Sequence, residues 1–249
     1  LLAETAVAAG MPAGVFNVLL GAGATAGDIL IRQPAVRVVS FTGSMRVGTM
    51  VATVAAKRNV RFQTEMGGKN VAIVLADADV AQAASLVAAG AMRYAGQKCT
   101  ATSRVIVEKK IEEKFLAALS AQVAAMVLGP VTDPAAVVGP LISEASRANI
   151  RGILESAGAE AVYAGVVPAG DAWSRGYWMA PAVLRGGSPD ADLAQRELFG
   201  PVLATFAADD LDHALALANG TPYGLSASLF TRDLKAAMSS LRRRSVSSA

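Results

Sequence analysis

The sequence contains little thiol and imidazole chemistry: one cysteine, Cys99, and one histidine, His213, in 249 residues. A single cysteine cannot form an internal disulfide, so we expect a reducing compartment, the cytoplasm. His213 stands among Asp209, Asp210 and Asp212. These acidic neighbours predict a solvated helix face rather than a catalytic or metal-binding histidine.

Long apolar runs are also lacking. The runs Met50–Ala56 and Leu116–Leu128 are either short or interrupted by polar residues. We therefore expect no membrane-spanning segment. The net charge is only +3, and much of it lies in Arg242–Arg244, which gives a nucleic-acid-binding function little support.

A hydrophobic content of 53% indicates a globular chain with a core large enough for one or two domains. The chain opens on Leu1, without the charged and apolar regions of a signal peptide. It begins within a predicted helix over residues 1–9, so we expect an internal fragment of a longer protein.

Apolar periodicity predicts alternating strands and helices. The predicted strands cover residues 15–20, 36–41, 60–64, 71–75, 104–108, 183–184 and 202–206, with an edge strand within 161–176 and another after Tyr223. The predicted helices cover residues 1–9, 21–30, 47–57, 77–95, 111–127, 144–157, 211–218 and 233–241. This order predicts an α/β fold. Over residues 15–64 the order strand–helix–strand–helix–strand predicts a parallel sheet whose ligands gather at the carboxyl ends of the strands, where Ser44 and Glu65 lie.

Two loops before predicted helices are candidate phosphate sites. Gly23 lies in the glycine-rich run Gly21–Gly27, and Gly43 and Ser44 precede the predicted helix over residues 47–57. Free backbone amides at a helix N-terminus attract an anionic phosphate. The alternatives are a plain turn at Gly23 and an ordinary helix cap at Ser44.

Three further motifs place reactive side chains at glycine-marked turns. They are Glu65-Met66-Gly67-Gly68-Lys69-Asn70, Gly96-Gln97-Lys98-Cys99-Thr100, and Glu197-Leu198-Phe199-Gly200-Pro201-Val202. Taken singly, each has an ordinary structural explanation: a surface carboxylate, a buried thiol, or a turn with a core phenylalanine. The polar neighbours of Cys99 favour an exposed nucleophile.

These motifs in this order resemble the aldehyde dehydrogenase superfamily, as do the stretches 10–18, 41–48 and 219–225. The resemblance covers nearly the whole chain. It implies that residues 1–67 are the C-terminal part of a Rossmann-type NAD(P)-binding domain. It also implies that residues 68–249 are the thiol-bearing catalytic domain, truncated at its C-terminal end.

The resemblance implies the following site. Cys99 is the nucleophile and Glu65 activates the hydrolytic water. NAD or NADP is held by Gly43 and Ser44 at the pyrophosphate and by Glu197 and Phe199 at the nicotinamide end, with Gly23, Glu65, Met66 and Gly67 among the cofactor-binding residues. No metal is required.

The implied reaction is oxidation of an aldehyde to a carboxylic acid through a cysteine thioester. The loop around Cys99 is similar to that of bacterial enzymes that oxidise oxo-acid semialdehydes such as 2-oxoglutarate semialdehyde, and Arg93 and Lys98 are candidates to bind a substrate carboxylate. Two alternatives stay open: a CoA-acylating relative, which the presence of Glu65 disfavours, and a catalytically silent structural or binding member of the fold.

The resemblance also places an oxyanion asparagine and a ribose-binding lysine before Leu1, and an oligomerisation strand after the final residues 241–249. We therefore expect a split sheet, an incomplete cofactor site and little activity in this chain by itself. The full-length parent is expected to be a homo-dimer or homo-tetramer.

Overall fold

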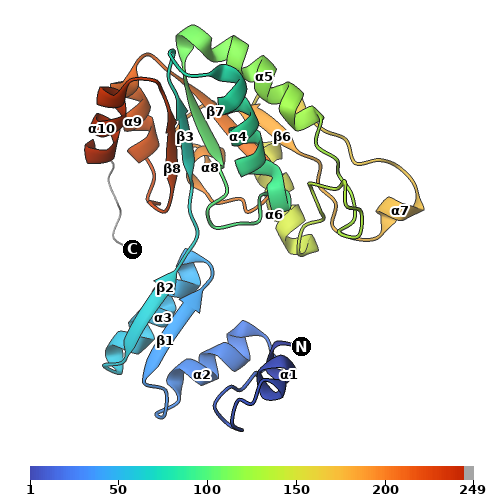
Figure 1. The fold of residues 1–249 in the computed structure, drawn as a ribbon, viewed down its shortest axis with the longest axis vertical. Helices are drawn as coiled ribbons and strands as arrows, with labels where there is room; N and C mark the ends of the chain where they lie inside the picture. The colour runs from blue at the N-terminus through green and yellow to red at the C-terminus, as the bar shows by residue number, and fades with distance from the viewer. Residues whose placement is uncertain (244–249) are drawn as a thin grey trace. The chain divides into compact units, whose positions relative to one another are not determined.

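The computed structural model describes residues 1–243 and divides the chain at the Met66–Gly67 bond into two compact units (Figure 1). The expectation for the end of the chain, as far as it concerns residues 244–249, lies outside the described part. None of the helices in residues 1–243 is long and apolar enough to cross a membrane.

The first unit is a small parallel β-α-β element preceded by short helical segments. Its elements are α1 (Leu2–Ala8), η1 (Gly23–Gly27), α2 (Asp28–Arg32), β1 (Val38–Thr42), α3 (Met45–Lys57) and β2 (Arg61–Glu65). Strands β1 and β2 pair in parallel from Val38 opposite Arg61 to Thr42 opposite Glu65. Both strands therefore end at the same edge, as the sequence predicts for this pair.

The predicted strand over residues 15–20 is wrong. No strand forms there in the described chain, and Val15, Phe16, Val18, Leu19 and Leu20 are between 41% and 92% exposed. A strand needs a neighbour for its backbone groups. The sheet of this unit is formed by β1 and β2 alone, so residues 15–20 have no neighbouring strand with which to pair.

The second unit is built on a six-stranded sheet with the order β5-β6-β7-β4-β3-β8. All neighbouring strands are parallel except β5, which pairs antiparallel with β6 at one edge. The strands are β3 (Val71–Val74), β4 (Arg104–Glu108), β5 (Ala161–Ala164), β6 (Ala182–Arg185), β7 (Val202–Ala208) and β8 (Ala227–Phe230). The predicted edge strand is β5.

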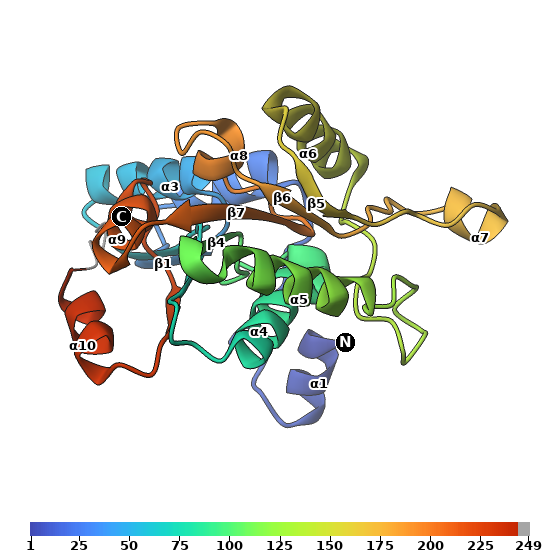
Figure 2. The ribbon, with the colours of Figure 1, turned by 90° about the horizontal axis from the view of Figure 1, so that it is seen from above.

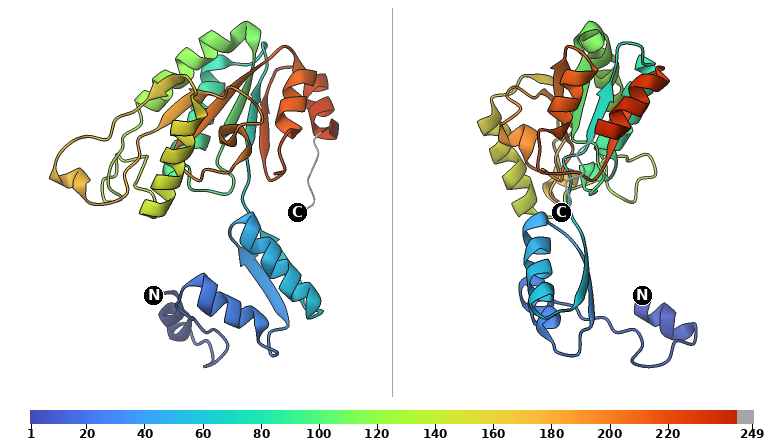
Figure 3. Two further views of the ribbon diagram at one scale, coloured as in Figure 1. Left: turned by 180° about the vertical axis from the view of Figure 1, so that it is seen from behind. Right: turned by 90° about the vertical axis from the view of Figure 1, so that its left-hand side faces the viewer.

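Helices cover both faces of this sheet. In Figure 2, α4 and α5 lie on one face and α6 and α8 on the other; the view from behind in Figure 3 shows α6 in front of the sheet. The helical elements are α4 (Val80–Met92), η2 (Arg93–Gly96), η3 (Lys109–Ile111), α5 (Glu112–Ala124), α6 (Glu144–Ala157), α7 (Asp171–Ser174), α8 (Asp192–Gln195), α9 (Leu211–Asn219) and α10 (Leu234–Arg243).

The core lies between the sheet and these helices. Strands β3, β4 and β7 are buried on both faces, as continuous apolar runs in a covered parallel sheet should be. Helix α4 buries Ala83, Ala84, Val87, Ala88 and Ala91, a spacing that lines one helical face. This rigid centre fixes the loops at the strand ends, where the predicted site residues lie.

Candidate functional site

Four of the predicted site residues of the first unit gather at the carboxyl ends of β1 and β2. The Gly43 amide donates to the Glu65 carbonyl oxygen at 3.0 Å. Ser44 caps α3, since its Oγ accepts a hydrogen bond from the Val47 amide at 3.4 Å. The Glu65 side chain is exposed, and its Oε1 accepts from Gln63 Nε2 at 2.8 Å.

Met66 packs against the start of α3. A Cβ added to Gly48 would lie 2.4 Å from Met66 Sδ, so the thioether occupies the space that a side chain at position 48 would need. Gly23 begins the separate turn η1 and is exposed. The N-terminus of α3 therefore has the geometry of an anion-binding site, whereas Gly23 belongs to another segment.

In the second unit, Cys99 is exposed on the loop between η2 and β4. The buried side chain of Asn70 holds this loop: Nδ2 donates to the carbonyl oxygens of Cys99 at 2.7 Å and Ala101 at 3.0 Å. Its Oδ1 accepts from the Ser226 amide at 2.9 Å. One amide group thus ties the loop that carries the thiol to the starts of β3 and β8.

A second amide side chain holds the other end of the loop. Gln97 Nε2 donates to the Pro140 carbonyl at 3.2 Å, and its Oε1 accepts from the Ile142 amide at 2.8 Å. The Lys98 ammonium lies 5.4 Å from the centroid of the Tyr94 ring, a cation–π contact. The peptide around the thiol is therefore fixed on both sides while the thiol itself stays accessible.

The helix before the loop ends at Met92, three residues earlier than predicted, because Tyr94, Ala95 and Gly96 all have positive φ. The left-handed conformation is costly for Tyr94 and Ala95 and free for glycine. A Cβ on Gly96 would lie 2.1 Å from the Gly200 carbonyl oxygen. This backbone contact joins the Cys99 loop to the loop of Glu197 and Phe199.

Glu197 approaches the Gly67-Gly68 turn. Its Oε1 accepts from the Gly68 amide at 3.1 Å, and a Cβ on Gly67 would lie 1.9 Å from its Oε2. Burial raises the pKa of the Glu197 carboxyl, while the Gly68 hydrogen bond and the positive charge of Lys69 lower it. Phe199 has a positive φ of 54° and remains 42% exposed. Gly68, Lys98, Glu197 and Phe199 line one small pocket.

The structure thus brings two groups of predicted residues together, each within its own unit. Gly43, Ser44, Glu65 and Met66 belong to the first, and Gly67, Cys99, Glu197 and Phe199 to the second. The approach of the Glu65 carboxylate to the Cys99 thiol stays a prediction.

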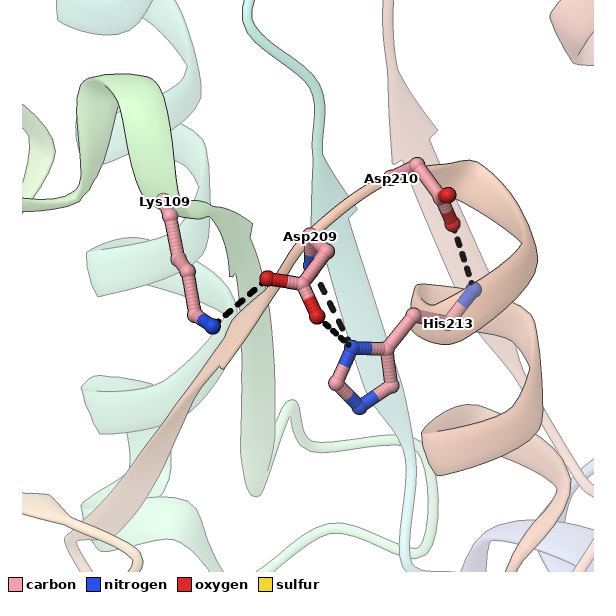
Figure 4. Close-up of polar contacts among 4 residues, drawn as sticks. All are labelled: Lys109, Asp209, Asp210 and His213. Atoms are coloured by element: carbon pink, nitrogen blue, oxygen red, sulfur yellow. Dashed lines mark hydrogen bonds and ion pairs between the residues drawn. The ribbon is translucent and has the colours of Figure 1, made fainter.

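His213 lies away from these residues, at the start of α9. Figure 4 shows its ring facing Asp209, which also meets Lys109: Nδ1 is 3.0 Å from Asp209 Oδ2, and Lys109 Nζ is 2.6 Å from Asp209 Oδ1. The His213 amide donates to Asp210 Oδ1 at 2.8 Å, which caps the helix. The side chains of His213 and Asp209 are 41% and 61% exposed, which fits the predicted solvated helix face. The described residues hold no cluster of three potential metal ligands.

A family model for the aldehyde dehydrogenase family matches residues 1–248. The chain belongs to the aldehyde dehydrogenase family. It is 42% identical over 228 residues to an alpha-ketoglutarate semialdehyde dehydrogenase of Haloferax volcanii, covering 90% of this chain and 47% of the relative. An aminoacetaldehyde dehydrogenase of Pseudomonas aeruginosa is 41% identical over 239 residues, with 95% and 48% covered.

The fold also matches solved structures of aldehyde dehydrogenases. The crystal structure of an NAD-dependent aldehyde dehydrogenase from Sinorhizobium meliloti superposes with a TM-score of 0.92 at 39% identity, covering 97% of this chain and 48% of that one. Other matching family structures are described as complexes with NAD+. The predicted family and fold class are therefore confirmed, and the chain spans about half the length of the curated relatives it matches.

Sequence reasoning missed the parts played by Asn70, Lys69 and Arg104. All three are polar and nearly fully buried. Asn70 and Lys69 stand within a quoted motif, but nothing in their spacing indicates that one would hold the Cys99 loop and the other would line a pocket. Only the folded sheet brings their partners, which are distant in sequence, to them.

Proposed function

We propose that this chain supplies the catalytic thiol and part of the cofactor site of an NAD(P)-dependent aldehyde dehydrogenase. Residues 1–67 would be the C-terminal part of the nucleotide-binding domain and residues 68–249 the catalytic domain. The observation that carries the proposal is the exposed Cys99 on a loop fixed by Asn70 and Gln97, one backbone contact away from the Glu197 loop.

The residues present fit a nicotinamide dinucleotide. Within the described chain, Glu197 Oε1 is used by the Gly68 amide and Oε2 accepts no hydrogen bond, which leaves an acceptor for a ribose hydroxyl. Glycine at position 67 lets this carboxylate lie against the backbone, where a Cβ would overlap it. The N-terminus of α3, with Gly43 and Ser44, offers amides for a pyrophosphate. NAD or NADP, when bound, would accept the hydride of the substrate.

Each catalytic residue then has one role. The Cys99 sulfur adds to the aldehyde carbonyl and forms a thiohemiacetal, and its backbone amide helps to hold the oxyanion. Loss of hydride leaves a thioester on Cys99. Glu65 takes a proton from the water that attacks this thioester, and the carboxylic acid departs as the thiol is restored.

Acyl transfer tests this proposal without the cofactor. An activated ester such as p-nitrophenyl acetate should acetylate Cys99 selectively, and mass spectrometry of the intact chain and its peptides should show a single acetyl group there. Cys99→Ser should lose the adduct, because a serine hydroxyl stays protonated and is a weak nucleophile without an adjacent base. An unreactive Cys99, alkylated no faster than a free thiol in a peptide, would favour the catalytically silent alternative.

A cofactor titration tests the expectation that this chain by itself binds the cofactor weakly. Titration of the chain with NAD+ and NADP+ should show no tight binding, because part of the nucleotide-binding domain is expected to lie outside it. Tight binding by this chain alone would contradict the proposed division of the cofactor site.

We propose a semialdehyde that carries a carboxylate, such as 2-oxoglutarate semialdehyde, as the substrate. Arg93, Tyr94 and Gln97 line a groove of about 600 Å³, and Gln97 is two residues from Cys99. An arginine can bind a carboxylate through two parallel hydrogen bonds. In the whole protein, Arg93→Leu should lower kcat/KM for a carboxylate-bearing aldehyde at least tenfold and spare a neutral aldehyde of the same length. Equal losses on both substrates would remove the idea.

For the whole protein we propose a homo-dimer or homo-tetramer in the cytoplasm, where Cys99 would stay reduced. Light scattering of the full-length protein measures the first point. A monomer at micromolar concentration would contradict it.

A further inference from the structure

A pocket of about 210 Å³ lies in the second unit between β3, β8, α9 and α10. Its lining includes residues from each of these elements, for example Ile73, Ser228, Leu215 and Ser240. The volume is sufficient for several water molecules or one small organic or inorganic ion.

The described lining of this pocket includes positively charged side chains but no negatively charged ones. Lys69 and Arg104 line the pocket and are only 2% and 4% exposed, whereas no aspartate or glutamate among the described residues lines it. Neither cation forms an ion pair within residues 1–243. Two positive side chains are therefore buried beside a volume whose described lining holds no carboxylate.

The two cations differ in how their donors are used. Arg104 donates to the carbonyl oxygens of Lys69, Leu217 and Ala218 at 3.2, 3.0 and 2.9 Å. The last two belong to the C-terminal turn of α9, whose partial negative charge partly compensates the guanidinium. In the described chain, the Lys69 ammonium makes no hydrogen bond, so its three donors have no partner among residues 1–243.

Burying an unpaired ammonium costs several kcal/mol, on the order expected for one ion removed from water. Burial is the main reason that the pKa of Lys69 falls to about 7, and repulsion from Arg104 lowers it further. The negative charge of Glu197 acts in the opposite direction but does not restore the ordinary value. An anion in the pocket would remove this penalty and keep Lys69 protonated.

We propose that this pocket is a binding site for a small oxyanion, a carboxylate or a phosphate, held by the Lys69 ammonium with hydroxyl groups of the lining as further donors. Ser226, Ser228, Ser240 and Tyr223 supply such hydroxyls. The site is separate from the Cys99 loop, although Asn70 lines the pocket and also bonds to the Cys99 carbonyl.

Calorimetric titration of the chain with inorganic phosphate, and in a second arm with acetate, tests the proposal near pH 7. We expect saturable binding at a single site in the millimolar range for at least one of the two anions. Lys69→Met should weaken it at least tenfold, about 1.4 kcal/mol or more. Lys110→Met is the matched control, because Lys110 is 76% exposed, pairs with Glu108 and lies outside the pocket; its affinity should stay within twofold of the original.

Proton uptake gives a second signature. Because Lys69 is partly neutral near pH 7 in the free pocket, binding of acetate, which is fully ionised at this pH, should draw a proton from the buffer, and the observed heat should change with the ionisation enthalpy of the buffer. Exposed lysines are already protonated at this pH and would show no such dependence.

A variant-independent measurement covers the case in which Lys69→Met fails to fold. Phosphate or acetate added to the isotope-labelled original chain should shift the backbone amides of Ser226, Ser228 and Ala218 with one common saturation curve. The proposal is overturned if neither anion binds saturably up to tens of millimolar. It is also overturned if binding survives Lys69→Met or if the shifted amides lie elsewhere.

Discussion

The contact between Gly96 and Gly200 is the sharpest test of how the two loops of the second unit are joined. Gly96 has a φ of +66°, and a Cβ there would lie 2.1 Å from the Gly200 carbonyl oxygen and 3.1 Å from the Ala91 carbonyl oxygen. Gly158 has a similar φ of +55°, but a Cβ there meets nothing within 4 Å. Alanine at position 158 therefore meets only the cost of the left-handed backbone. Alanine at position 96 meets that cost and a steric overlap with backbone atoms as well.

The left-handed backbone costs an alanine about 1–2 kcal/mol, partly offset by the smaller entropy of the unfolded alanine chain. At Gly96 the Cβ overlaps backbone atoms that no side-chain rotation can move away. The backbone must shift instead, at a cost of about 1–3 kcal/mol, typical of overpacking. We expect Gly158→Ala to lower the free energy of unfolding by about 1 kcal/mol and Gly96→Ala by about 2–4 kcal/mol.

Tryptophan fluorescence during urea unfolding measures the free energy of unfolding of the second unit in both variants. The two tryptophans of the chain, Trp173 and Trp178, lie in the second unit with ring centroids 4.7 Å apart. Their signal therefore reports the unit that holds both substitutions. Equal losses in the two variants would refute the contact between Gly96 and Gly200, since the backbone cost alone is common to both.

Four further substitutions have defined outcomes. Gly67→Ala should lower the free energy of unfolding by about 1–3 kcal/mol because its Cβ falls 1.9 Å from Glu197 Oε2. Gly152→Ala, in an open helical position, should be neutral or stabilising by up to about 1 kcal/mol, and an equal loss in both would contradict the overlap. Asn70→Ala leaves three backbone groups without their partner and should cost about 2–4 kcal/mol, with faster amide exchange in the loop it holds; unchanged exchange would contradict that role. Lys69 has a pKa of about 7, so above pH 7 the unfolded chain holds a proton that the folded chain has released, and stability should rise with pH up to the ordinary lysine value. Lys69→Met should remove this contribution, up to about 1.4 kcal/mol per pH unit, and parallel curves for the two proteins would show that the pKa is not lowered.

The local pattern of the sequence was sufficient to predict most of the helices and strands. The strand over Arg104–Glu108 and the helix over Glu144–Ala157 were predicted with the observed bounds. The apolar periods and the capping residues that define these elements lie within the elements themselves. The same reasoning failed at residues 15–20, where an apolar run has no neighbouring strand in the described chain.

The sequence by itself determined the family, through several motifs in one order along nearly the whole chain. It also determined most strands and the longer helices of the second unit and the position of the thiol on a loop, because these depend on residues close together in the chain. The tertiary structure alone decided that Asn70 holds the carbonyl of Cys99, that Gly96 meets Gly200, and that Lys69 and Arg104 share a pocket without a carboxylate. The first of these contacts joins residues 29 apart in the chain, and the second joins residues 96 and 200. Their distances and burial are set by how the strands pair and how α9 and α10 pack, and no spacing along the chain encodes them.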